Sequence, residues 1–276
     1  MSPPRLRFAP SPNGRLHLGH AYSALLNAEM ARALHGTLLL RIEDIDPQRC
    51  RPELTEAILA DLAWLGLGFP EPVWRQSARM STYRAALEAL RARGLVYPCT
   101  CTRREIQAAA GSRRDPDGAP LYPGTCRGRP VPDGPHAWRL DTARALALCP
   151  GPLAYTAFAP GEPETVRVAD PARWGDAVIA RKDVPTSYHL AVVLDDAAQG
   201  ITHVVRGRDL EAATDLHVLL QRLFGLPTPR YHHHDLIRDE AGDKLSKSLR
   251  SEALAALRER GVSPEAVRAR LGVPAR

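Results

Sequence analysis

Residues 5–46 read RLRFAPSPNGRLHLGHAYSALLNAEMARALHGTLLLRIEDID, and this stretch predicts the fold of the chain. A short apolar strand over residues 5–9 leads into a loop, PSPNG, that carries two prolines and a glycine. Apolar side chains then recur at the spacing of one helix face, at Leu18, Ala21, Tyr22, Leu25 and Leu26. A second strand, TLLLRI, follows at residues 37–42. A strand, a helix and a strand in this order form a βαβ unit, so we expect the two strands to be parallel.

Similar patterns continue along the chain. The predicted elements are helices near 54–65 and 83–90, strands at 190–194 (LAVVL) and 201–205 (ITHVV), a helix capped by Thr214 and closed by Gly225, a strand near Tyr231, and two short helices after residue 248, the second opened by Ser263 and Pro264. Ten of the 25 prolines lie between Asp115 and Pro163, so we expect a small irregular insertion there rather than a continuation of the sheet. The expected parts are two halves of a nucleotide-binding domain, 1–98 and 175–248, an insertion at 99–174 and a short helical tail at 249–276.

Composition narrows the function classes. The 276 residues are 44% hydrophobic, which is ample for one main core and a smaller one. No apolar run approaches the ~18 residues of a membrane helix, and the N-terminal MSPPRLRFAPSPNG lacks the apolar segment of a secretory signal. We therefore expect a cytoplasmic protein without a membrane partner. The formal net charge of +6 favours polyanionic partners such as nucleic acid, although an arginine-rich enzyme of another kind carries the same excess.

His17-Leu18-Gly19-His20 stands at the junction between the first strand and the helix. In a parallel α/β sheet, the carboxyl ends of the strands form the ligand crevice, and a helix N-terminus there favours phosphate. Gly19 lets a nucleotide approach the backbone, and the two imidazoles, three residues apart, can both donate hydrogen bonds to a phosphate. Alone, the pattern is equally that of two surface histidines at a helix cap.

Lys244-Leu245-Ser246-Lys247-Ser248 forms a second polar motif near the end of the chain. Only three of the 37 basic residues are lysines, and two of the three lie in these five positions. Two ammonium groups with hydroxyls between them suit a loop that closes over a polyphosphate. Alone, the motif is also that of a solvated basic loop.

Cys99, Cys101 and Cys126 gather in the predicted insertion. An odd total of five cysteines in a cytoplasmic protein argues against a disulfide framework. Three thiolates in a loop-rich segment with little core of its own fit a structural zinc site. On chemistry alone the fourth ligand stays open, with His136 and Cys149 as candidates, and three free buried thiols are the alternative.

Together, HLGH and KLSKS resemble the paired HIGH and KMSKS motifs of class I aminoacyl-tRNA synthetases. RFAPSPNG at 7–14, RIEDID at 41–46, SYHLAVVLDD at 187–196 and ITHVVRGRDL at 201–210 are similar to the glutamyl/glutaminyl branch of that family. The resemblance implies an α/β class I synthetase fold, with a Rossmann-type parallel sheet, a small zinc-containing insertion and a helical tail. It also implies that ATP, with Mg²⁺, is a substrate. His17, Gly19, His20 and Lys247 would bind ATP, and His17, His20, Lys244 and Lys247 would stabilise charge at its α-phosphate.

The same resemblance implies an amino-acid pocket lined by Arg7, Ala9, Ser11, Glu43, Tyr188 and Arg206. These residue types suit glutamate, because two guanidinium groups can each hold a carboxylate in fork geometry and Glu43 can pair with the ammonium. The pattern C-x-C…Y-x-x-x-C is similar to that of glutamyl-queuosine tRNA(Asp) synthetases, which implies that Tyr122 is the fourth zinc ligand.

The activity implied by the resemblance is the reaction of L-glutamate with ATP to give glutamyl-adenylate, followed by transfer to an RNA hydroxyl. Only 28 residues follow Ser248, which is room for two short helices but not for an anticodon-reading domain. We therefore expect the acceptor to be queuosine in the anticodon stem-loop of tRNA(Asp), bound by a monomer, rather than the 3′ end of tRNA(Glu). The alternatives are a catalytic fragment of a glutamyl-tRNA synthetase and a catalytically silent RNA-binding paralogue.

Overall fold

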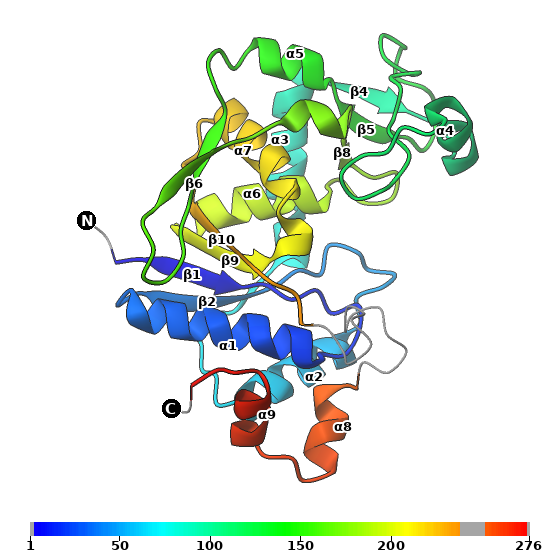
Figure 1. The fold of residues 1–276 in the computed structure, drawn as a ribbon. Coiled ribbons are helices and arrows are strands. Elements are labelled where there is room, and N and C mark those ends of the chain that lie inside the picture. Colours follow the sequence, from blue (N-terminus) through cyan, green and yellow to red (C-terminus); the bar gives the residue numbers. More distant parts are fainter. Residues whose placement is uncertain (1–2, 238–251, 275–276) are drawn as a thin grey trace.

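The computed structural model describes residues 3–237 and 252–274, and Figure 1 shows its fold. The predicted βαβ unit is confirmed by β1 (Arg5–Phe8), α1 (Leu18–Ala33) and β2 (Thr37–Ile42). The two strands pair in parallel, with Arg5 opposite Thr37 and Phe8 opposite Leu40. The short strand β3 (Trp74–Arg75) pairs in parallel with the other edge of β2. The loop after β1 and the end of β2 therefore lie at the same edge of this sheet.

Four more strands continue the layer beside β1. They are β9 (His203–Gly207), β10 (Arg230–His234), β6 (Ala154–Ala157) and β7 (Thr165–Val168). The amide of Thr202 donates to the carbonyl oxygen of Arg5 at 3.0 Å, which fixes β9 next to β1. β10 is parallel to both β9 and β6, whereas β7 is antiparallel to β6. The carboxyl ends of β1, β2 and β9 thus open towards one region of the molecule (Figure 1).

Helices cover both faces of this layer (Figure 1). On one side α1 packs with α2 (Pro52–Trp64), α8 (Leu254–Glu259) and α9 (Pro264–Arg270), and on the other lie α3 (Met80–Ala92), α5 (Thr142–Ala147), α6 (Tyr188–Ala198) and α7 (Ala213–Phe224). Three short 3₁₀ helices are η1 (Gln76–Arg79), η2 (Pro171–Trp174) and η3 (Arg208–Leu210). None of the helices in the described ranges is long and apolar enough to cross a membrane.

Two predicted elements were wrong in type or boundary. The LAVVL run at 190–194, predicted as a strand, lies inside helix α6, whose N-cap Ser187 accepts a hydrogen bond from the amide of Leu190 at 3.5 Å. The helix is buried on most sides, so its apolar run has no polar face to reveal a helical period. Thr214 does not cap α7 but lies within its first turn. Gly225 ends α7 in the left-handed conformation, as predicted.

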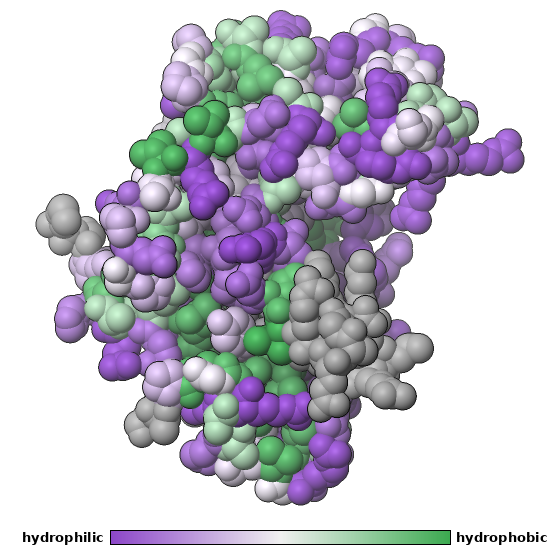
Figure 2. Space-filling model, in the orientation of Figure 1, coloured by the Kyte–Doolittle hydropathy of each residue, from purple (hydrophilic) through white to green (hydrophobic). Residues whose placement is uncertain are grey.

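The expected insertion at 99–174 is not wholly separate from the main sheet. The small sheet beside it consists of β4 (Val96–Cys99), β5 (Ala137–Leu140) and β8 (Val178–Ala180), which pair in antiparallel fashion, with α4 (Arg103–Ala110) beside them. Only β5 of these strands lies wholly within 99–174. By contrast, β6 and β7 extend the large sheet beyond β10. Leu140, Leu153 and Ile179 share one apolar core with α6 and α7. Figure 2 shows hydrophilic side chains gathered over the region of α4.

The tail contains the two predicted short helices, and Ser263 caps the second, accepting from the amide of Ala266 at 3.2 Å. Leu254 and Val267 of the tail are buried in the core formed by α1 and α2. The amide of Leu254 also donates to the carbonyl oxygen of Leu16 at 2.8 Å. The tail is therefore fastened beside the N-terminus of α1.

Candidate active site

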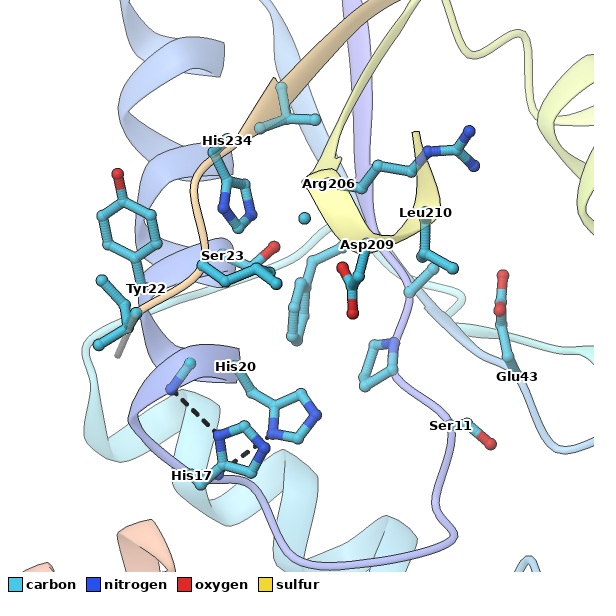
Figure 3. Close-up of a pocket in the computed structure, with 18 of the residues that line it drawn as sticks. Ser11, His17, His20, Tyr22, Ser23, Glu43, Arg206, Asp209, Leu210 and His234 are labelled. Carbon is cyan, nitrogen blue, oxygen red and sulfur yellow. Dashed lines mark hydrogen bonds between the residues drawn. The ribbon is translucent and has the colours of Figure 1, made fainter. Parts of the chain in front are cut away.

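His17 and His20 form a reciprocal cap at the start of α1, which Figure 3 shows as dashed lines. The amide of Gly19 donates to Nδ1 of His17 at 3.1 Å, and the amide of His17 donates to Nδ1 of His20 at 3.2 Å. Because each Nδ1 accepts a hydrogen bond, the proton of each neutral imidazole lies on Nε2. The rings are 3.8 Å apart, centroid to centroid. The cap thus presents two Nε2–H donors from one helix terminus.

Both imidazoles are neutral near pH 7. Burial lowers the pKa of His17, and burial together with the neighbouring His17 lowers the pKa of His20 to about 4. A second positive charge so close to the first ring, at the positive end of the helix dipole, is unfavourable. The pair therefore offers hydrogen-bond donors rather than positive charges.

One pocket brings together nine of the side chains and backbone positions that the sequence singled out. It is lined by Arg7, Ala9, Ser11, His17, Gly19, His20, Glu43, Tyr188 and Arg206. These residues come from β1 and its following loop, α1, the end of β2, α6 and β9, and Figure 3 shows several of them around one opening. Lys244 and Lys247 lie outside the described residues. Tyr22, Asp209 and His234 also line the pocket and were not selected from the sequence.

Arg41 joins Glu43, which lines this pocket, to the buried Asp196, and it was missed in the sequence. Its side chain is fully buried, with Nη2 2.9 Å from Oε1 of Glu43 and Nη1 2.8 Å from Oδ1 of Asp196. Asp196 also accepts from Nε of Arg7 at 3.1 Å. Arg41 lies on β2 and precedes Glu43, which follows the end of that strand, by two residues, so the alternation of an extended chain was a signal that could have linked them.

The pKa directions follow from burial and these contacts. Burial alone would raise the pKa of Asp196, but Arg7 and Arg41 hold it below its ordinary value. Burial raises the pKa of Glu43, and its ion pair with Arg41 opposes that rise only in part. An additional nearby cation would therefore favour the ionised form of Glu43.

Arg206 differs from the other buried arginines in its partners. Its side chain is buried, yet no carboxylate oxygen of the described residues lies within 4 Å of its guanidinium. It contacts neutral groups only: Nε2 of His233, the hydroxyl of Tyr188, Nδ1 of His217 and Oγ1 of Thr214. A buried cation without a counterion is costly, which points to a ligand that supplies negative charge.

Cys99, Cys101 and Cys126 form a compact group whose sulfur atoms all lie within 4.8 Å of one another. The hydroxyl of Tyr122 lies 3.4 Å from Sγ of Cys99 and 3.7 Å from Sγ of Cys101, and it accepts from the amide of Cys126 at 2.9 Å. Three sulfurs and a phenol oxygen converge in this way on one small volume, so the group can hold a metal ion.

Neither of the two alternative fourth ligands joins this group. Cys149 is buried in the main apolar core, with α5 and α7, rather than beside the other cysteines. His136 is half-buried, and its Nδ1 lies 2.8 Å from the carbonyl oxygen of Gly134. Neither is among the described histidine, cysteine and acidic residues that cluster with the three thiols.

The chain on both sides of residues 238–251 meets the site. Leu236 and Ile237 line the pocket. On the far side, Ala253 makes an isolated antiparallel bridge with His17, next to the hydrogen bond between Leu254 and Leu16. The described residues on either side of 238–251 therefore both lie close to the histidine cap.

The parallel sheet, the capped helix and the buried charges together define a class I synthetase domain. Residues 4–129 and 164–274 match the family described as tRNA synthetases class I (E and Q), catalytic domain. The match covers most of the chain and includes both the HLGH and the KLSKS segments. The chain is a member of this family.

Within that class, the chain belongs to the glutamyl-Q tRNA(Asp) synthetases. A relative of that name from Rhodobacter capsulatus is 50% identical over 282 residues, which cover 97% of this chain and 99% of the relative. Another from Aromatoleum aromaticum is 45% identical over 253 residues, covering 91% and 76%. A glutamate tRNA ligase from Elizabethkingia meningosepticum, solved in complex with its amino acid, matches with a TM-score of 0.66 at 27% identity. The match covers 86% of this chain but only 50% of that ligase.

Proposed function

We propose that the chain activates L-glutamate with ATP as glutamyl-adenylate and then transfers the glutamyl group to queuosine in the anticodon loop of tRNA(Asp). The relatives named glutamyl-Q tRNA(Asp) synthetase support the overall reaction, because identity to one of them is 50% across 99% of its length. The observation that supports the choice of amino acid is the charge balance of the pocket.

One buried arginine of the pocket lacks a counterion. Arg7 and Arg41 are paired with Asp196 and Glu43, whereas Arg206 forms no ion pair with any described residue, including Asp209, which also lines the pocket. Glutamate carries two carboxylates and one ammonium at neutral pH, so it can offer one carboxylate to Arg7 and the other to Arg206, whereas glutamine has a single carboxylate. The ammonium also favours the ionised form of Glu43.

The two arginines divide the carboxylates between them. Arg7 uses Nε to contact Asp196, and its two terminal nitrogens have no partner among the described residues. Arg206, on the neighbouring strand β9, offers the uncompensated charge beside Tyr188. We assign the amino acid to the set Arg7, Ala9, Ser11, Glu43, Tyr188 and Arg206.

ATP, as its Mg²⁺ complex, belongs at the histidine cap in this proposal. An oxygen of the glutamate carboxylate attacks the α-phosphorus, and pyrophosphate leaves. The Nε2–H groups of His17 and His20 donate to the phosphate oxygens as negative charge develops, and Gly19 allows the nucleotide to approach the helix. Lys244 and Lys247 neutralise the departing phosphates, an assignment supported by the attachment of both flanking segments beside His17.

A second cavity supports an RNA acceptor. It shares Tyr188 with the amino-acid pocket and is lined by five arginines: Arg49, Arg103, Arg104, Arg139 and Arg181. Guanidinium groups suit phosphates and stacked bases. The anticodon stem-loop of tRNA(Asp) would thus reach the adenylate from the side of the small sheet. One chain supplies every residue assigned here, so we propose that the enzyme acts as a monomer. We propose the cytoplasm as its location.

The deciding experiment supplies the full chain with labelled glutamate, ATP and tRNA(Asp), prepared with and without queuosine. We expect label on the queuosine-containing tRNA alone, and the same labelling when its 3′-terminal adenosine has been removed. Equal labelling of both tRNAs, or labelling of tRNA(Glu) at its 3′ end, would favour a glutamyl-tRNA synthetase fragment. Absence of glutamate-dependent pyrophosphate exchange would instead favour the silent RNA-binding paralogue.

We further propose that Cys99, Cys101, Cys126 and Tyr122 hold one structural zinc ion. The convergence of the Tyr122 hydroxyl on two of the sulfurs supports the phenolate as fourth ligand. Four protein ligands would leave no open position for substrate, so the ion would stabilise the small sheet rather than take part in the reaction.

Cys101→Ser is expected to reduce the zinc content from one ion per chain to nearly none and to lower the melting temperature. Tyr122→Phe should keep the three thiolates and lose zinc more readily to a chelator. The matched control is Cys149→Ser, which also changes a buried cysteine but should leave the zinc content at one. Elemental analysis of the purified proteins gives the answer, and a zinc content of Cys101→Ser equal to that of the control would refute the site.

A further inference from the structure

Arg206 is enclosed by a set of neutral acceptors that the reaction itself does not use. A guanidinium has five N–H donors. Nε donates to Nε2 of His233 at 3.3 Å, Nη1 to Nδ1 of His217 at 3.3 Å and to the hydroxyl of Tyr188 at 3.4 Å, and Nη2 to Oγ1 of Thr214 at 2.7 Å. Among the described residues this leaves one N–H of Nη2 for a ligand. We call Thr214, His217 and His233 the neutral shell of Arg206.

The hydrogen bonds of the shell fix its protonation. Since Arg206 only donates, Nδ1 of His217 and Nε2 of His233 must accept, so neither ring can carry both protons. Nε2 of His217 then donates to Nδ1 of His189, 3.3 Å away. Burial, and then the charge of Arg206, lower the pKa of His217 well below its ordinary value and that of His233 to about 3.

The shell therefore satisfies the guanidinium without neutralising it. Arg7, in the same pocket, and the buried Arg41 behind it are held by the carboxylates of Asp196 and Glu43, whereas Arg206 is held by imidazoles and a hydroxyl. Thr214 and His217 are almost completely buried on α7, so water cannot replace them as hydrogen-bond acceptors for Arg206. Polar groups so deeply buried normally serve a specific partner.

We propose that Thr214, His217 and His233 are positioning residues that hold Arg206 rigid yet uncompensated, so that its charge selects an anionic amino-acid substrate over its neutral amide. This inference rests on the proposed function, since it concerns the same amino-acid pocket. A carboxylate in the shell would neutralise Arg206 in place of the substrate's carboxylate. The pocket would then lose its preference for glutamate over glutamine.

The test compares two variants of equal size, His217→Asp and His217→Asn, in the full chain. Asparagine keeps a neutral acceptor beside Nη1, whereas aspartate adds a buried negative charge there. We expect the KM for glutamate in pyrophosphate exchange to rise roughly 100-fold in His217→Asp relative to His217→Asn, with the KM for ATP unchanged. Selectivity for glutamate over glutamine should fall by a similar factor.

A second pair guards against a folding defect in His217→Asp. Thr214→Ser keeps the hydroxyl that accepts from Nη2, and Thr214→Val removes it without adding charge. We expect Thr214→Val to bind glutamate about tenfold more weakly than Thr214→Ser, because one buried N–H loses its acceptor. Binding is measured by titration calorimetry on variants whose melting temperatures match.

The outcomes separate the two proposals. A wild-type chain that does not bind or activate glutamate would overturn the proposed function, and the role of the shell with it. A wild-type chain that binds glutamate, together with equal glutamate KM values for the aspartate and asparagine variants or equal affinities for the valine and serine variants, would overturn the neutral shell alone.

Discussion

Replacing His20 with alanine is expected to slow glutamyl-adenylate formation by roughly 100- to 1,000-fold, the usual effect of losing one preorganised donor to a developing charge. The Nε2–H of His20 is fixed in direction, because Nδ1 already accepts from the amide of His17. The variant should keep its KM for glutamate, since the residues around that substrate are untouched. The measurement is pyrophosphate exchange at saturating ATP and glutamate.

His20→Gln is the matched control, because its side-chain amide offers an N–H donor near the same place and should recover part of the rate. The pH dependence provides an independent check. With a pKa of about 4 in the folded chain, His20 stays neutral from pH 5.5 to 8, so its protonation should not limit the rate there. If His20→Ala kept the wild-type rate of pyrophosphate exchange, the assignment of the histidine cap to the ATP site would be wrong.

The same pKa has a consequence for stability. Because the pKa of His20 is lower in the folded chain than its ordinary value of 6.5, the unfolded chain binds the extra proton first as the pH falls. Stability from the neutral imidazole is therefore fully present above about pH 6.5 and is lost progressively as the pH falls towards 4.

The parts of the fold that were predictable from sequence have a local cause. The first βαβ unit was readable because apolar positions recur at helical spacing in α1 and form a short apolar run in β2, and Gly225 marked a helix end through its backbone freedom. The LAVVL run misled because α6 is apolar on nearly every side. The pairing of β6 with β10 joins segments about seventy residues apart, and a proline-rich stretch gives no local sign of such a pairing.

The residues of the candidate site were predictable where they belong to a sequence motif. They were not predictable where their role depends on contacts between distant parts of the chain. HLGH and RIEDID gave the histidine cap and Glu43 directly. Thr214, expected to cap α7, instead accepts from Arg206, and His233, which no motif singled out, accepts from the same guanidinium. Such roles depend on the side chains that α6, α7, β9 and β10 bring together, which a single sequence does not display.

Among the residues whose role depends on contacts between distant parts of the chain, Arg41 has the largest expected effect on stability. Arg41→Met keeps most of the side-chain length and removes the charge, which leaves Glu43 without its ion pair and Asp196 with Arg7 alone. Removing one partner of a buried ion pair costs about 3–5 kcal/mol, because the remaining charge stays buried and uncompensated. We expect the free energy of unfolding, measured by urea denaturation at pH 7.5, to fall by that amount.

Arg32→Met is the matched control. Arg32 also pairs with a glutamate, Glu29, at 2.7 Å, but its side chain is 76% exposed, so its loss should cost less than about 1 kcal/mol. The deficit of Arg41→Met should shrink at lower pH, because without the arginine the pKa values of Glu43 and Asp196 rise and the protonated acids no longer need a partner. In the double variant Arg41→Met/Glu43→Gln, the cost should be smaller than the sum of the two single variants. A loss of unfolding free energy in Arg41→Met no larger than that in Arg32→Met would contradict this prediction. Arg41 would then not be the residue that keeps Glu43 and Asp196 ionised, and it could not be counted among the charges that favour glutamate.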